Sequence, residues 1–135
     1  MTQKYINDLA YKIVGCAIEV HKNLGPGLLE SIYEKCLLEE LKEKKLIYNS
    51  QVQIPLIYKN KSLECNLILD IIVEDLIIVE LKAVETIIPV HKAQLLTYLK
   101  LTNKPKELLI NFNCENITNS LVSLVTEDFS VLPKE

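Results

Sequence analysis

Residues 70–82 constrain the fold of this chain most strongly, because they form two apolar runs around a short acidic turn. Each run has the length of one strand, and a tight turn between them would pair the strands as antiparallel neighbours. Side chains alternate between the faces of a strand, so Glu80 and Lys82 point one way and Val79 and Leu81 the other. Charged groups are costly in so apolar a strand unless other groups compensate them. The segment therefore predicts a buried sheet with charged side chains gathered on one side.

The turn between the two strands decides whether Asp70 meets Glu80. A two-residue turn would place Asp70 opposite Val79, whereas the three-residue turn Glu74-Asp75-Leu76 would place it opposite Glu80 on the same face. A slip of one residue reverses the face, so the register is decisive. We predict an extra turn residue or bulge that brings the two carboxylates together. The alternative is a pair of strand-end charges with Lys82 as a salt-bridge partner.

The composition fits a single globular domain over residues 1–135. Hydrophobic residues make up 49% of the chain and charged residues 24%, which excludes a disordered chain. No apolar run approaches the roughly 20 residues of a membrane span, and the polar N-terminus lacks the apolar core of a signal peptide. We therefore expect a cytoplasmic protein with no membrane contact. The high apolar content also suggests a homodimer, although an ordinary core would absorb it equally well.

The net charge and the spacing of the cysteines limit which nucleic acids and metals this chain could bind. The net charge is −3 and all 15 basic residues are lysines, so the bidentate contacts of arginine with guanine or phosphate are excluded. Nucleic-acid binding, if present, would then lack strong sequence specificity and would rest on a local patch of lysines. The cysteines are widely spaced without a Cys-x-x-Cys pair, which favours buried thiols over a zinc site; they are Cys16, Cys36, Cys65 and Cys114.

The rest of the chain predicts an α/β fold, a mixed central sheet with helices on its faces, in the order α-α-β-β-β-α-β. Residues 23–27 break the first helix, and Pro26 suits the first turn of the second, with Gly25 as its cap. Pro55 indicates an edge position or a bulge. Residues 117–125 fit either a last edge strand or a helix. We expect helices near 5–24, 26–45 and 89–100, and strands near 51–58, 62–73, 76–82 and 108–112.

Gly27, Glu30 and Tyr33 form a first additional group of candidates, spaced three residues apart at the start of the second helix. This spacing places them on one stripe, and Gly27 would allow another backbone to approach closely. The alternative is a helix-start acid that the helix dipole favours, followed by a core tyrosine.

His91, Gln94 and Tyr98 form a second group, on one stripe of the helix near 89–100. A polar stripe on a helix that follows the strand of Glu80 and Lys82 could border a site. The alternative, an exposed polar face, explains the same spacing.

Taken together, these motifs resemble the PD-(D/E)XK nuclease superfamily, whose restriction-endonuclease-like core is an α/β fold. The Gln94-x-x-x-Tyr98 helix resembles its RecB-like branch, and Gly27-x-x-Glu30-x-x-Tyr33 resembles the small GxxExxY protein family. The order and spacing of the motifs carry this resemblance over nearly the whole chain. Two further segments belong to it, Val79-Glu-Leu-Lys-Ala83 and Leu109-Ile-Asn-Phe112.

The resemblance implies a role for each candidate. Asp70 and Glu80 would ligate Mg²⁺ or Mn²⁺ with the main-chain carbonyl of Leu81, and Glu30 would add a carboxylate directly or through water. Lys82 would orient or deprotonate the attacking water and stabilise charge on the phosphate. Oxygen ligands suit such a hard cation, which both acidifies water and offsets phosphate charge. The substrate, nucleic acid and most simply DNA, would lie against Gln94, Tyr98, His91 and Tyr33.

The chain also departs from the pattern of this family. Ile68 stands where relatives often have an arginine, and Glu107 and Leu108 occupy a region that often holds a glycine. These departures weaken the case for tight nucleic-acid binding but leave the proposed ligands in place. Three hypotheses therefore stand: a metal-dependent nuclease, a nuclease-fold binding or assembly module without catalysis, and an unrelated α/β domain held by salt bridges.

Overall fold

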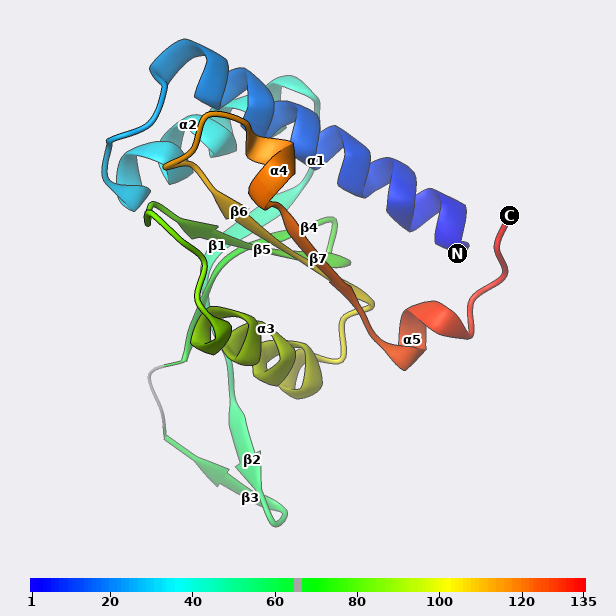
Figure 1. Cartoon of the computed structure of the whole chain (residues 1–135). Helices are drawn as coiled ribbons and strands as arrows, with labels where there is room; N and C mark the ends of the chain where they lie inside the picture. The colour runs from blue at the N-terminus through cyan, green and yellow to red at the C-terminus, as the bar shows by residue number, and fades with distance from the viewer. Residues whose placement is uncertain (65–66) are drawn as a thin grey trace.

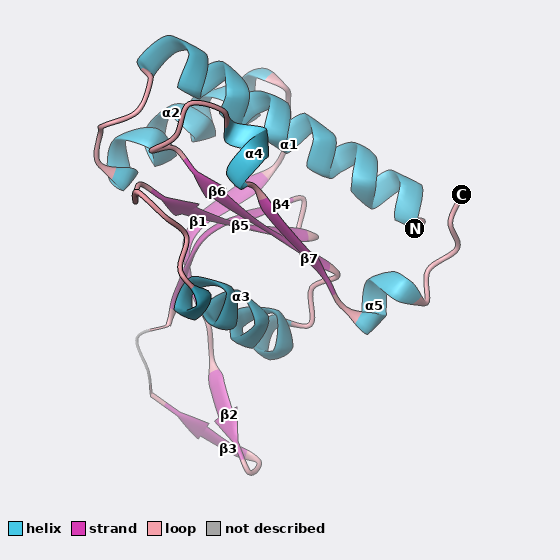
Figure 2. Cartoon of the chain, in the orientation of Figure 1, coloured by secondary structure: helices cyan, strands magenta, loops and turns pink. Residues whose placement is uncertain are grey.

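The computed structural model describes residues 1–64 and 67–135, and these residues form a main sheet with helices on both faces (Figures 1 and 2). Two neighbouring strands in its middle run parallel, and all other neighbours run antiparallel. This confirms the predicted mixed sheet. Across the sheet the described strands follow the order β1 (Tyr48–Gln53), β4 (Ile68–Val73), β5 (Ile77–Lys82), β6 (Lys106–Asn111) and β7 (Val122–Val125), with β5 and β6 as the parallel pair.

The helices divide between the two faces of this sheet. The long helix α1 (Gln3–Leu24) and helix α2 (Glu30–Glu43) cover one face, and α3 (Pro89–Thr102) lies against the other (Figure 1). A short helix, α4 (Ile117–Ser120), packs beside α1, and α5 (Glu127–Ser130) precedes the C-terminus. Among the described residues, no helix has both the length and the apolar character that a bilayer crossing requires.

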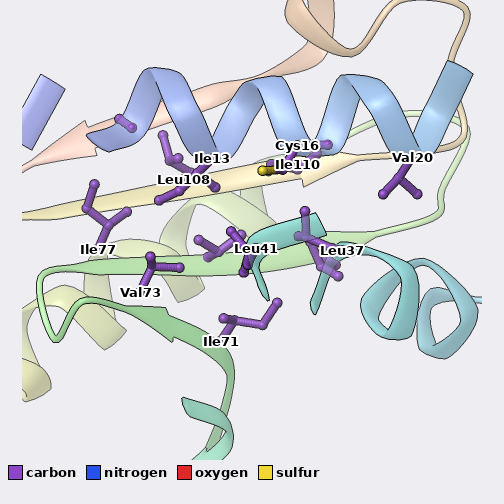
Figure 3. Close-up of a cluster of buried hydrophobic side chains, with 14 of the residues drawn as sticks. Ile13, Cys16, Val20, Leu37, Leu41, Ile71, Val73, Ile77, Leu108 and Ile110 are labelled. Atoms are coloured by element: carbon purple, nitrogen blue, oxygen red, sulfur yellow. The ribbon is translucent and has the colours of Figure 1, made fainter. Parts of the chain in front are cut away.

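The larger part of the core lies between α1, α2 and the sheet (Figure 3). Helix α1 buries one stripe of apolar side chains at three- and four-residue spacing, as its sequence pattern predicts. Ile13 and Ala17 of that stripe are fully buried, as are Val79 and Ile110 on the central strands. A smaller apolar cluster lies on the α3 face around Ile54, Leu69, Ile72, Ile78 and Leu99.

The second helix begins later than the sequence predicts. Helix α2 starts at Glu30, not at Pro26, because the two flanking glycines hold the chain in a loop. Gly25 has a φ of 71° and ends α1, donating its N–H to the His21 carbonyl, while Gly27 has a φ of 99°. A side chain at Gly27 would meet no atom within 4 Å, so its backbone angle, and not a close approach, favours glycine.

Two predicted strands are each divided in the structure, and the region 117–125, left open by the sequence, takes a definite form. Pro55 interrupts the strand expected near 51–58, because proline cannot donate to a ladder, and a separate hairpin of β2 (Leu56–Tyr58) and β3 (Lys61–Leu63) follows. The strand expected over 62–73 includes residues 65–66, which lie outside the described residues. The region 117–125 contains both alternatives, helix α4 and then strand β7.

Candidate active site

The turn between β4 and β5 contains three residues, Glu74-Asp75-Leu76, because Val73 pairs with Ile77. The first two turn residues have positive φ angles of 53° and 56°, the conformation of a tight two-residue hairpin turn. The third is the extra residue that sets the register. Continued along the strands, this register places Asp70 opposite Glu80. The predicted three-residue connection is confirmed.

Asp70 and Glu80 are held against each other by backbone hydrogen bonds. The Leu81 N–H donates to Oδ2 of Asp70 at 2.8 Å, and the Asp70 N–H donates to Oε1 of Glu80 at 3.2 Å. Each carboxylate is thus fixed by the strand that carries the other. Burial raises the pKa of Glu80 strongly, and the negative charge of Asp70 raises it further. A cation bound beside these two acids would stabilise the charged forms of both carboxylates.

A cleft of about 210 Å³ opens beside this pair. Helix α2, the edge strand β1 and the consecutive strands β4 and β5 line it. The cleft unites the four residues that the sequence suggested for catalysis, which were Glu30, Asp70, Glu80 and Lys82. Its lining is completed by Ser31 and Glu34 of α2, Gln51 of β1 and Leu81 of β5.

Lys82 lies on the same face of β5 as Glu80 and is half-buried. Among the described residues, no carboxylate lies within 4 Å of its ammonium group. Lys82 therefore forms no salt bridge with a described residue, and the salt-bridge alternative is wrong for this structure. Its positive charge still lowers the pKa of Glu80, against the larger effects of burial and Asp70. The ammonium group is thus near the acids and available to another partner.

Helix α2 brings two acids to the cleft, and the sequence analysis identified only one of them. Glu30 is the first residue of α2, and Glu34 follows one turn later. The Gln51 amide donates to Oε1 of Glu34 at 2.8 Å. Burial raises the pKa of Glu34, and the charge of Asp70 adds to this against the hydrogen bond from Gln51. The spacing of four residues from Glu30 was the available signal, because it places both acids on one helix face.

Tyr33 fixes the loop and the helix start that carry Glu30. Its hydroxyl donates to the Gly25 carbonyl at 2.6 Å and accepts from the Leu28 N–H at 3.1 Å. Its ring is fully buried and stacks on Phe112 with a centroid distance of 4.5 Å. Tyr33 therefore lies beneath the wall of the cleft and not in its lining.

The three candidates on α3 occupy different environments. His91 accepts the Ile88 N–H at Nδ1 and caps the helix, and Gln94 is exposed. Tyr98 packs against the smaller apolar cluster. Burial, and then the charges of Glu80 and Asp70, raise the pKa of Tyr98, which places its hydroxyl in the field of the acidic pair. None of the three lines the cleft as described.

Comparison with models of known protein families matches residues 7–122 to the PD-(D/E)XK nuclease superfamily. This chain belongs to the PD-(D/E)XK nuclease superfamily. The match runs from α1 to the start of β7, so it includes every residue that lines the cleft. Membership of this superfamily indicates nuclease activity on a nucleic acid. Comparisons with curated proteins and with solved structures found no match.

PD-(D/E)XK nucleases usually use divalent metals, so the cleft must be tested for fit to one. Among the described residues, no three His, Cys, Asp or Glu side chains lie close enough together to form a complete metal-binding group. Asp70 and Glu80 supply two adjoining carboxylates, and Leu81 supplies backbone atoms. Mg²⁺ typically takes one or two carboxylates and completes its shell with waters and substrate phosphate. The pair therefore fits a cation of this kind, with the remaining positions left to water and substrate.

Glu107 is a further acid that the sequence analysis did not assign to the site. It lies on β6 beside Ile78 of β5, is completely buried, and has no hydrogen-bond partner for either carboxylate oxygen among the described residues. Burial, with a smaller contribution from Glu80, raises the pKa of Glu107 to about 9. Glu107 is therefore a protonated acid at neutral pH.

Proposed function

We propose that this protein is a Mg²⁺- or Mn²⁺-dependent nuclease that hydrolyses phosphodiester bonds, most simply in DNA and without strong sequence specificity. One observation carries the proposal: a nuclease-superfamily chain gathers the three acids and the lysine that its sequence suggested for catalysis into one cleft. Those residues are Glu30, Asp70, Glu80 and Lys82. We also infer that the chain belongs to the GxxExxY group, on the motif formed by Gly27, Glu30 and Tyr33.

The roles of the residues follow from their chemistry. The carboxylates of Asp70 and Glu80 would hold the cation together with the Leu81 carbonyl, and Glu30 would reach it through water. When bound, the cation acidifies a water and offsets charge on the phosphate. Lys82 stands beside the acids, where its ammonium group would orient the attacking water and stabilise the phosphate oxygens. The oxygen of a water oriented there would bond to phosphorus in line with the leaving oxygen, whose bond to phosphorus would break. One proton of the water would pass to solvent, the leaving oxygen would take a proton from solvent, and the other proton of the water would stay on the new phosphate oxygen.

The remaining candidates would act around this centre. Tyr98 and Gln94 on α3 would contact the substrate on the side away from α2, with His91 holding the start of that helix. Tyr33 would act as a positioning residue, because its two hydrogen bonds hold the loop before Glu30. Glu34 would supply a second carboxylate from α2 to water in the cleft.

The alternative function is a nuclease-fold binding or assembly module without catalysis. The net charge of −3 and the lack of arginine favour this alternative, because nucleic-acid affinity rests mainly on positive charge. A cleavage assay distinguishes the nuclease from the noncatalytic module. We expect wild type to cut plasmid and linear DNA with Mg²⁺ or Mn²⁺, and Glu80→Ala to lose this cutting while Glu43→Ala, an exposed control, retains it. A folded wild type that cuts neither DNA nor RNA with either metal would support the module.

We also expect a homodimer formed through the outer face of α1. Tyr11 is 82% exposed there and Gly15 meets no atom within 4 Å of its missing Cβ, beside an apolar hollow of about 430 Å³. Glycine costs about 1 kcal/mol in a helix relative to alanine, and no atom of the described residues lies close enough to Gly15 to require it. Two copies crossing antiparallel near Gly15 would set Lys12 of one against Glu19 of the other. Light scattering that finds only monomer at every concentration would contradict this.

A further inference from the structure

The β2–β3 hairpin extends away from the rest of the chain (Figures 1 and 2). Among the described strands, these two pair only with each other, from Leu56 with Leu63 to Tyr58 with Lys61. Lys59 and Asn60 form the turn with φ angles of 49° and 63°, the conformation of a tight two-residue hairpin turn. The hairpin is therefore an ordered two-stranded ribbon that the sheet does not need for its own pairing.

The tip of this ribbon has a charge opposite to that of the whole protein. Its charged residues are Lys59 and Lys61, and no acid occurs between residues 54 and 63, although the chain as a whole carries −3. Tyr58 is 57% exposed, and the Lys59 ammonium lies 5.5 Å from the centroid of its ring. The contact with Tyr58 orients one of the two lysines at the tip.

The ribbon leaves the sheet at the end where the acidic pair lies. The last pair of the β1–β4 ladder joins Gln53 to Ile68, and the Ile54 N–H donates beyond it to the Leu67 carbonyl. Asp70 lies two residues inward from Ile68, and the cleft residue Gln51 two residues inward from Gln53. The seven residues from Gln53 to Lys59 span roughly 20 Å when extended. Strand β1, which lines the cleft through Gln51, is thus separated from β2 of the ribbon by Ile54 and Pro55 alone.

We infer that the lysine tip of the β2–β3 hairpin contacts the phosphate backbone of a nucleic-acid duplex bound at the acidic cleft. This inference rests on the proposed function. A substrate held at the acids needs positive charge elsewhere, because the cleft itself carries one lysine against four acids. A two-stranded ribbon also has the dimensions that a major groove admits. Lys59 and Lys61 would give sequence-independent attraction, in keeping with a chain that lacks arginine.

The test compares Lys59→Gln/Lys61→Gln with the control Lys44→Gln/Lys134→Gln, which removes the same charge from exposed sites off the hairpin and the cleft. Binding of a fluorescent 20-base-pair DNA duplex is measured with Mg²⁺ against salt, in a Lys82→Ala background so that the duplex stays intact. Two lost phosphate contacts lower the slope of log K against log salt by about 1.8, which weakens binding roughly 30-fold at 0.15 M salt. The control should keep the slope of its parent.

Two results would overturn the inference: an unchanged slope for the hairpin variant, or an equal loss for the control. Hydrolysis of bis(p-nitrophenyl) phosphate separates this failure from failure of the proposed function, because so small a diester cannot reach the tip. In proteins that retain Lys82, we expect wild type and Lys59→Gln/Lys61→Gln to hydrolyse this small diester at equal rates. A wild type that binds duplex through the hairpin but hydrolyses neither diester nor duplex would refute catalysis and leave the hairpin contact supported.

Discussion

Replacing Glu107 with leucine should stabilise the protein, and the gain should grow as the pH rises. Glu107 lies between Ile78 of β5 and Leu124 of β7, with both oxygens unpartnered among the described residues. A buried polar group without a partner costs about 1–3 kcal/mol, so Glu107→Leu should raise the free energy of unfolding by about 2 kcal/mol at pH 5.

The pH dependence follows from the direction of the shift. The pKa of Glu107 rises from an ordinary 4.5 to about 9 on folding, so the folded chain keeps a proton that the unfolded chain releases between these values. The contribution of Glu107 is therefore most favourable below pH 4.5 and is lost as the pH rises toward 9. Each pH unit in this window lowers the folding equilibrium constant of wild type about tenfold. Between pH 5 and 8 the advantage of Glu107→Leu should therefore grow by about 4 kcal/mol.

Urea denaturation at pH 5, 6, 7 and 8 measures this directly. Glu107→Gln serves as the matched variant, because it keeps the shape and polarity of the side chain but cannot ionise. The free energy of unfolding of Glu107→Gln should lack the pH dependence that Glu107 causes. It should also lie below that of Glu107→Leu, because the amide remains a buried polar group. Glu43→Leu, at an exposed position, should differ from wild type by a constant amount. Parallel pH profiles for wild type and both Glu107 variants would refute the reasoning.

Three further predictions test the site. Lys82→Ala should lower DNA cleavage by about 10²–10⁴-fold without unfolding the chain, and Lys44→Ala should not; equal rates for Lys82→Ala and wild type would remove Lys82 from the mechanism. Tyr33→Phe should lower the free energy of unfolding by about 1–2 kcal/mol in chemical denaturation, because it removes both hydrogen bonds of the hydroxyl; an unchanged value would contradict the anchoring role. Deleting Leu76 should retain cleavage in a folded protein, because the remaining two-residue turn still joins Val73 to Ile77 and keeps Asp70 opposite Glu80; lost cleavage in a folded protein would contradict the view that this register alone brings the two acids together.

The sequence was sufficient for the central hairpin because that information is local. The two-residue alternation is read from residues 70–82, and the same residues limit the turn to two or three residues, of which we predicted the longer. The position of Glu30 and Tyr33 on α2 followed in the same way from helical spacing. In each case the residues that decide the outcome lie within about ten positions of one another.

The remaining features depend on contacts between distant segments. Gln51 reaches the cleft because β1 pairs with β4, which the chain forms only after an intervening hairpin. The burial of Glu107 depends on strands from both sides of it, and nothing in its own neighbours marks it as unpartnered. The late start of α2 was missed for a different reason, since Pro26 fits a helix start as well as it fits the loop formed there.

The most direct test of the central claim is calorimetric titration of Mn²⁺ into wild type, Glu80→Ala and Glu43→Ala. If Asp70 and Glu80 form the metal site, wild type and Glu43→Ala should bind Mn²⁺ alike and Glu80→Ala should lose that binding. Equal binding by all three proteins, or no binding by a folded wild type with a DNA duplex present, would contradict the claim that this carboxylate pair is a metal centre.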